Sequence, residues 1–148
     1  MTSPPAPPPI EPYAELFAHG ADIGVRGIGP TPAAAFEQAA LALMTAVTDP
    51  ARVSPQTAID IVCEAPNEGV LLVDWLNALI YEMAVRRLVF GRFAVQIRDR
   101  RLEGKAWGER VNRRRHSPAV EPKGATLTEL KVEKRDDGAW IAQCVVDV

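Results

Sequence analysis

The sequence predicts an α+β fold, a single domain in which a mostly antiparallel β-sheet carries two helices packed on one face. Two long segments have apolar side chains at helical spacing, and several shorter segments have the alternating pattern of strands. The predicted order is β-β-α-β-α-β-β-β-β. Because strands and helices do not alternate regularly along the chain, a parallel sheet of βαβ units is excluded.

The first two predicted strands cover residues 13–18 and 23–28, with a turn at Gly20 between them. The second strand region contains three glycines, which are Gly24, Gly27 and Gly29. Glycine weakens a strand, but it also allows a bulge or the close approach of another backbone. We therefore expect one of these two features in the second strand.

The first helix is predicted to begin with Thr31 as its N-cap and Pro32 at its first position. Asp49 and Pro50 end it, because the residue before a proline disfavours helical backbone. Its apolar residues recur at helical spacing, at Phe36, Ala40, Leu43, Met44 and Val47. This spacing predicts that one face of the helix is buried.

The second helix is predicted to run from the N-cap Asn67 to about Arg87. Its apolar stripe consists of Leu72, Trp75, Leu76, Leu79, Ile80 and Met83. Asp74 and Asn77 lie on a different face, at a spacing of three residues. The stripe predicts a helix that packs against the sheet along one side.

The remaining predicted strands cover residues 57–65, about 90–97, 102–107, 126–134 and 139–148. The last two are joined by Arg-Asp-Asp-Gly at residues 135–138. Asp-Gly tolerates positive φ, so this segment predicts the turn of a β-hairpin.

Residues 1–12 are rich in proline and can build neither a helix nor a sheet ladder, so we predict a disordered tail. Residues 13–148 are long enough for one domain with its own hydrophobic core. The net charge of −2 provides no overall field that attracts nucleic acid. The start of the chain lacks the features of a signal peptide, and no apolar run is long enough to cross a bilayer. We therefore expect a cytoplasmic protein without membrane contact.

Two carboxylates lie far apart in the sequence, Asp22 beside the second predicted strand and Asp147 in the last one. If these two strands pair in a sheet, the carboxylates meet at one end of it. Paired carboxylates at a sheet end are typical ligands of a hard cation. The alternative is that each aspartate is a solvated residue at a strand end, which is the commoner role.

Four further polar residues are candidates for a site, which are His19, His116, Glu121 and Lys123. His116 follows a basic run that includes Arg110, Arg113, Arg114 and Arg115. Such a run is either a solvated loop or a patch for phosphate or for an acidic partner surface. The sequence contains no phosphate-binding loop, no nucleophile elbow and no zinc motif of the CxxC or three-histidine type.

From about Tyr13 to Val148, an ordered set of segments resembles the archease family. The matching segments are H-x-A-D-I-G at 19–24, the helix at 35–40 leading to Met44 and Thr48-Asp49, L-L-V-D-W-L-N at 71–77, W-G-E at 107–109, His116 followed by E-x-K-x-A-T at 121–126, and V-D-V at 146–148. No single segment is decisive, but the whole set in one collinear order is quite specific to the family.

The resemblance implies an archease-like sheet with two helices and an accessory role rather than catalysis. Archease activates an RtcB-type RNA ligase by helping it to load guanylate from GTP and to turn over repeatedly. That GTP-dependent ligase joins RNA ends with a 3′-phosphate or 2′,3′-cyclic phosphate to a 5′-hydroxyl, in tRNA splicing or RNA repair. The chain would then contact RNA only indirectly, through its ligase partner.

The resemblance also implies a divalent metal (calcium, magnesium or manganese) held among acidic residues. It places Asp22, Asp147 and Val148 at the metal, and it places His19, His116, Glu121 and Lys123 toward the partner or the nucleotide. At two positions where the family has acidic residues, this chain has Ala18 and Pro30. Because loss of carboxylates lowers the affinity of a calcium site, we expect metal binding to be weak or absent.

Two other functions remain open. The chain is alternatively a diverged binding module that keeps the archease fold and has lost metal binding and ligase activation. Ala18 and Pro30 favour this alternative, whereas Asp22 and Asp147 oppose it. The third function, a metal-dependent hydrolase acting through the two aspartates and a histidine, is the weakest, because so few ligands hold an activated water poorly.

Overall fold

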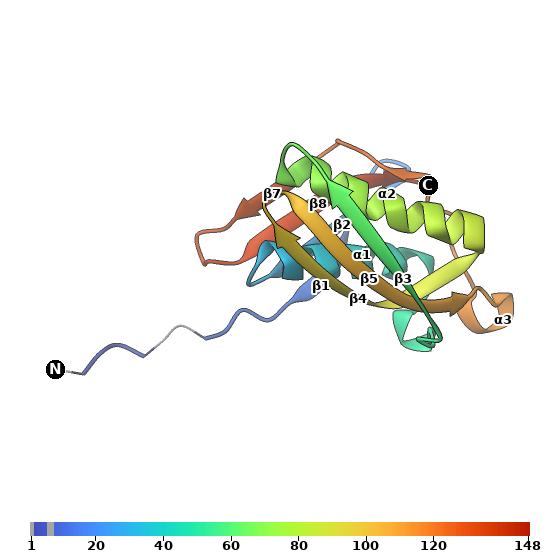
Figure 1. Cartoon of the computed structure of the whole chain (residues 1–148), viewed down its shortest axis with the longest axis horizontal. Coiled ribbons are helices and arrows are strands. Elements are labelled where there is room, and N and C mark those ends of the chain that lie inside the picture. The colour runs from blue at the N-terminus through green and yellow to red at the C-terminus, as the bar shows by residue number, and fades with distance from the viewer. Residues whose placement is uncertain (1, 6–7) are drawn as a thin grey trace.

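The computed structural model describes residues 2–5 and 8–148 (Figure 1). In chain order, its elements are β1 (Tyr13–His19), β2 (Asp22–Gly29), α1 (Pro32–Val47), the 3-10 helix η1 (Pro50–Arg52), β3 (Thr57–Glu64), α2 (Glu68–Arg86), β4 (Leu88–Arg98), β5 (Arg101–Arg110), α3 (Arg113–His116), β6 (Gly124–Ala125), β7 (Lys131–Lys134) and β8 (Trp140–Asp147).

The strands form two antiparallel sheets rather than one. The larger, five-stranded sheet has the order β1-β2-β8-β6, and β7 also pairs with β8. The three-stranded sheet has the order β3-β5-β4. The predicted α+β class and the antiparallel pairing are confirmed. Alternation along a strand shows which face is apolar, but it does not show which strands share a ladder.

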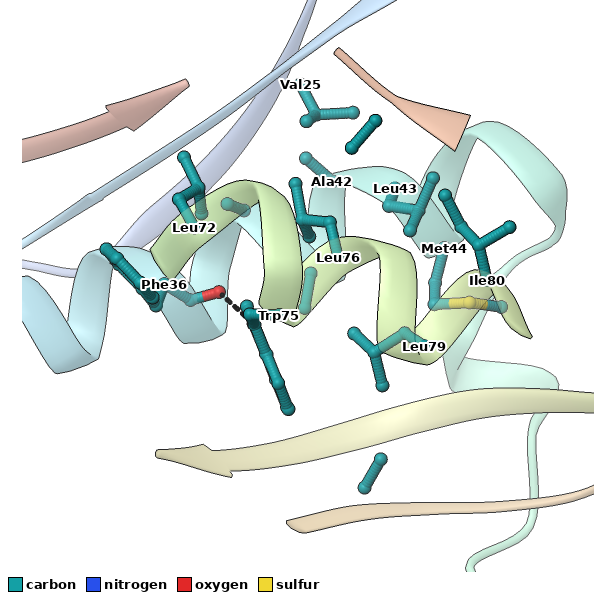
Figure 2. Close-up of a cluster of buried hydrophobic side chains, with 14 of the residues drawn as sticks. Val25, Phe36, Ala42, Leu43, Met44, Leu72, Trp75, Leu76, Leu79 and Ile80 are labelled. Atoms are coloured by element: carbon teal, nitrogen blue, oxygen red, sulfur yellow. Dashed lines mark hydrogen bonds between the residues drawn. The ribbon is translucent and has the colours of Figure 1, made fainter. Parts of the chain in front are cut away.

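Helices α1 and α2 lie between the two sheets (Figure 2). Helix α1 contacts β2 on one side and β4 on the other, and α2 contacts β3 and β5 as well as β6 and β8. Each sheet therefore has the helices on one of its faces, as the sequence predicts, but the helix layer is shared. This arrangement encloses a single core between the sheets.

The core is centred on side chains of the two helices (Figure 2). Trp75 and Phe36 are fully buried, and the indole Nε1–H of Trp75 donates a hydrogen bond to the Phe36 carbonyl at 3.2 Å. The ring of Phe93 meets the Trp75 ring edge-on, at a centroid distance of 6.2 Å. The only polar group of the tryptophan is therefore satisfied inside the core, which ties α2 to α1.

Helix α1 lies directly on the backbone of β2 at Gly27. A Cβ atom added to Gly27 would lie 2.0 Å from the carbonyl oxygen of Ala35 and 2.3 Å from the amide nitrogen of Ala39. Only glycine permits this separation, since real Cβ atoms are not found so close to backbone atoms. The close backbone approach predicted for the second strand is thus found at Gly27.

The strand predicted at residues 126–134 is divided. Residues 124–125 form β6 and residues 131–134 form β7, while the segment between them is irregular, with a positive φ of 54° at Glu129. The one-turn helix α3 and η1 were not predicted, because both are too short to show a period in the sequence.

Residues 2–5 and 8–12 contain no helix or strand. The tail predicted at 1–12 also includes Met1, Ala6 and Pro7, which lie outside the described residues. Over the part of the chain that the structure describes, no helix has the length and apolar character needed to cross a membrane.

Candidate functional site

Asp22 and Asp147 are brought together by the pairing of β2 with β8. Ile23 is opposite Val146, so Asp22 and Asp147 follow as the next opposing pair at the end of the ladder. The backbone N–H of Val148 donates a hydrogen bond to Asp22 Oδ1 at 3.3 Å. His19 is the cross-strand partner of Asp22 in the β1–β2 hairpin and is exposed. The sequence-distant groups thus meet at one end of the five-stranded sheet.

The segment that carries Glu121 and Lys123 reaches the same place. The backbone N–H of Lys123 donates to the carbonyl of Asp147 at 2.8 Å, and Gly124 in β6 pairs with Asp147. The side chains of Glu121 and Lys123 are both exposed. The structure therefore gathers most of the predicted site residues around Asp147.

Asn77 of α2 fixes this segment to the body of the protein. Its amide oxygen accepts the backbone N–H of Ala125 at 2.8 Å, and its amide nitrogen donates to the carbonyl of Ala125 at 3.3 Å. The side chain therefore pairs with β6 as a neighbouring strand would. Asn77 is the last residue of the L-L-V-D-W-L-N segment at 71–77, and this contact gives it a structural role.

The side chains at this end of the sheet do not form a metal centre by themselves. Among residues 2–5 and 8–148, no three side chains of histidine, cysteine, aspartate or glutamate lie close enough to hold a metal ion. Asp22 and Asp147 supply two carboxylates, whereas calcium takes six to eight oxygen ligands. The residues present therefore do not fit a well-held resident metal.

Pro30 and Asp22 lie at opposite ends of β2. Pro30 follows the far end of β2, eight residues from Asp22, and a strand of that length spans about 25 Å. A carboxylate at residue 30 would therefore not reach the two aspartates. Ala18 is opposite Ile23, so its side chain lies on the other face of the sheet from Asp22.

His116 is buried in this chain and contacts Glu109, whereas His19, Glu121 and Lys123 are exposed. Its ring is fully buried, with Nε2 3.2 Å from Glu109 Oε2. The ring Nδ1 accepts the backbone N–H of Asn112 at 2.8 Å, so the ring carries its proton on Nε2 and donates it to the carboxylate. His116 thus holds the α3 turn against β5.

Glu109 is the buried centre of this second group of polar residues. Its carboxylate also accepts the Ser54 N–H at 2.5 Å and forms an ion pair with Arg115. The hydrogen bond from Ser54 lowers the pKa of Glu109 below its ordinary value, and His116 and Arg115 lower that pKa further. The carboxylate therefore stays ionised in a buried position where it has three partners.

Sequence analysis did not assign Glu109 a role. On β5 every second residue from Leu102 to Gly108 is buried, so alternation predicts that Glu109 points outward. The glutamate is buried because α3 and the segment after η1 fold over that end of the strand. The one feature of the sequence that points to Glu109 is its place in the W-G-E segment, seven residues before His116.

Comparison with known proteins identifies the family of this chain. The model of the Archease protein family (MTH1598/TM1083) matches residues 14–148. The chain belongs to the archease family. It is 38% identical to Protein archease of Pyrococcus furiosus over 138 residues, which are 90% of this chain and 97% of that protein. It is 37% identical to Protein archease of Methanosarcina acetivorans over 139 residues, covering 90% of this chain and 94% of the relative.

The fold is also that of a solved structure of similar size. The solution structure of Methanobacterium thermoautotrophicum protein 1598 superposes with a TM-score of 0.75 at 28% identity, covering 91% of this chain and 98% of that one. The segments at 35–40 and 71–76 that resemble archease belong to the core, whereas the polar residues of the other segments lie at two places. One is the Asp22–Asp147 end of the sheet, and the other is the Glu109–His116 network.

Proposed function

We propose that this chain is a non-catalytic accessory protein of a GTP-dependent, RtcB-type RNA ligase in the cytoplasm. It promotes guanylylation of the ligase and its repeated turnover in the joining of a 3′-phosphate or 2′,3′-cyclic phosphate to a 5′-hydroxyl. The observation that carries this proposal is the family match, which extends over residues 14–148 and includes the segments that meet at Asp147.

The Asp22–Asp147 end of the sheet supports a role in contacting a partner. Asp147 and Lys123 are exposed, and Asp22 is half-buried with its carboxylate fixed by the Val148 N–H. Carboxylates on a protein surface are electrostatically complementary to a cationic patch on a partner. Lys123 provides a point charge for a phosphate or a partner carboxylate.

The test is multiple-turnover ligation by the ligase of the same organism, with GTP and manganese, in the presence and absence of this protein. We expect more than one ligation per ligase molecule only when the protein is added. Asp147→Ala should abolish this gain, because it removes half of the carboxylate pair. Asp136→Ala is the matched control, since Asp136 is an exposed aspartate in the β7–β8 turn. Equal activation by both variants would exclude a role for Asp147.

The diverged binding module is the second candidate, and one observation favours it. Among the described residues, no third histidine, cysteine, aspartate or glutamate joins the carboxylates of Asp22 and Asp147. If a competent ligase gains nothing from this protein, the fold serves another partner. Hydrolysis of phosphoesters with added manganese would instead support the metal-dependent hydrolase.

We propose that any divalent cation binds weakly here, with the carboxylates of Asp22 and Asp147 as its ligands. Dissociation constants of about 10⁻⁴ to 10⁻³ M are typical of the weakest protein calcium sites. Calorimetric titration with calcium, magnesium and manganese should give values in this range or no saturation. Saturation at micromolar concentration, lost in Asp22→Asn, would show that the backbone completes a strong site.

A further inference from the structure

Six arginines gather around α3 and the adjoining ends of α2 and β5. This arginine end consists of Arg86, Arg87, Arg110, Arg113, Arg114 and Arg115. Two backbone contacts join its parts, because Arg110 is the cross-strand partner of Leu88, and the Val111 N–H donates to the Arg87 carbonyl at 2.8 Å. Figure 1 shows α3 next to the point where α2 ends and β4 begins.

Most of this positive charge is uncompensated. Arg86 pairs with Glu82, and Arg115 pairs with Glu109. The other four arginines are exposed, and among the described residues none of them has a carboxylate oxygen within 4 Å. The protein has a net charge of −2, so the arginine end is a local positive region.

The outer face of the three-stranded sheet provides a contrast. It also has exposed cations, but Arg101 is paired with Glu64 at 2.7 Å, and Lys105 lies 3.5 Å from Asp60. Cross-strand pairs of this kind are an ordinary feature of a solvated sheet face. Arg92 and Arg98 of the same sheet are also exposed without a carboxylate within 4 Å among the described residues, so the arginine end differs in holding four unpaired arginines in one place.

Hydrogen bonds of Asn112 and of the buried residues His116 and Thr48 hold the α3 part of the arginine end in a fixed shape. Asn112 Oδ1 accepts the backbone N–H groups of Arg114 and Arg115, each at 3.0 Å. The His116 ring fixes the Asn112 backbone, and the Thr48 hydroxyl donates to the His116 carbonyl at 2.5 Å. A surface that is ordered before binding loses less conformational entropy when a ligand arrives.

The chemistry of the arginine end favours a nucleic acid over an acidic protein. Its cations are all arginines, whose planar guanidinium groups bind phosphate and carboxylate alike in bidentate fashion, so the surface beside them must decide between the two. Arg87 and Arg113 also border a cleft of about 370 Å³. Its other lining side chains are mainly apolar and include Ile80, Met83, Val111 and Val120, with Glu121 at its edge. A nucleotide presents a phosphate next to a flat apolar base, which suits a cationic rim around an apolar cleft.

We propose that the arginine end binds single-stranded RNA directly, with its phosphates on the arginines and an unpaired base against the cleft. This differs from the indirect contact that the resemblance to archease implies. The choice of RNA over another phosphate polymer rests on the proposed function. The arginines of this site lie on α2, β5 and α3 and in the segments that follow them, whereas Asp22 and Asp147 lie on β2 and β8.

The experiment is fluorescence anisotropy of a labelled single-stranded RNA with the isolated full-length protein, without ligase, at 50 to 200 mM salt. We expect dissociation constants of about 10⁻⁶ to 10⁻⁴ M that weaken as salt rises. The triple variant Arg110→Gln, Arg113→Gln and Arg114→Gln should bind at least tenfold more weakly. Its salt slope should fall by about 2, since each lost contact with a single strand removes about 0.7.

A second triple variant serves as the matched control. Arg98→Gln, Arg100→Gln and Lys134→Gln remove the same charge from exposed positions away from α3. RNA binding by this control should stay within about twofold of the unmodified protein at 200 mM salt, where distant charges are screened. Equal losses in the two triple variants would overturn the proposal. The single variant Arg114→Glu provides the same test if the triple variant unfolds.

Two competitors separate RNA from other polyanions. Unlabelled RNA should displace the probe, whereas polyglutamate of equal charge should not. Displacement by polyglutamate as effective as that by RNA would assign the arginine end to an acidic protein surface and overturn the proposal. Ligation assays with the same variants distinguish failure of this proposal from failure of the proposed function. If a variant loses RNA binding but still activates the ligase, the RNA contact has no role in activation. If the unmodified protein binds RNA but does not activate the ligase, only the accessory role is refuted.

Discussion

Replacing Gly27 by alanine tests the placement of α1 on β2. The added Cβ would lie 2.0 Å from the Ala35 carbonyl oxygen and 2.3 Å from the Ala39 amide nitrogen. Ordinary contact needs about 3.5 Å, so α1 must move by more than about 1 Å. Both blocking atoms belong to the backbone of a helix with eight buried residues, so no single side chain can rotate away.

The expected cost follows from this geometry. Overpacking a core costs roughly 1–3 kcal/mol, and a backbone clash belongs at or above the upper end of that range. We therefore expect Gly27→Ala to lower the free energy of unfolding by about 3 kcal/mol, or by about 10 °C in Tm for a chain of this size. Gly124→Ala is the control, since its Cβ would meet only Asn77 Oδ1, at 3.6 Å.

Urea unfolding followed by circular dichroism measures both variants. Gly124→Ala should stay within about 0.5 kcal/mol of the unmodified protein or be slightly more stable, because alanine reduces the entropy of the unfolded chain. If Gly27→Ala also stayed within about 0.5 kcal/mol, α1 would not lie on β2 as closely as the structure shows, and the reasoning would be refuted.

Two further predictions concern the polar groups behind the candidate surfaces. Asn77→Ala should lower the free energy of unfolding by about 1–2 kcal/mol, because it leaves the N–H and carbonyl of Ala125 without their side-chain partner. Hydrogen exchange at Ala125 should accelerate in this variant, and an unchanged rate would contradict the role of Asn77. The Ser54 N–H is the main reason that the pKa of Glu109 lies below its ordinary value of 4.5. The ionised carboxylate therefore stabilises the fold fully above pH 4.5, and this stabilisation is lost as the pH falls through the folded-state pKa. Urea midpoints measured between pH 6 and 3 should therefore fall more steeply for the unmodified protein than for Glu109→Gln, and parallel curves would show that Glu109 does not titrate as described.

The local features of the fold are already determined by the sequence. The side chain of Thr31 accepts the Ala34 N–H and caps α1, and Asn67 caps α2 through the Val70 N–H. Gly138 has the positive φ of 89° that the Asp-Gly turn predicts. Each of these features depends on residues within three or four positions of one another, so the sequence pattern contains the information needed to predict them.

The sequence predicted that Asp22 and Asp147 meet if their two strands pair, and β2 does pair with β8. The two aspartates are 125 positions apart, so no local pattern fixes their distance. The two strand-like runs raised the possibility of this pairing, but only the register of the ladder, in which Ile23 is opposite Val146, places both aspartates at the same end of it.

Other properties were decided only by the tertiary structure. The division of the strands into two sheets, and the contacts of Thr48 and Ser54 that close the Glu109–His116 network, depend on segments distant in the sequence. Alternation and helical period describe which face of an element is apolar, and they contain no information on which element covers that face. For this protein, the sequence by itself predicted the two long helices with their N-caps, most of the strands and the family, whereas packing decided which polar residues are buried and which are exposed.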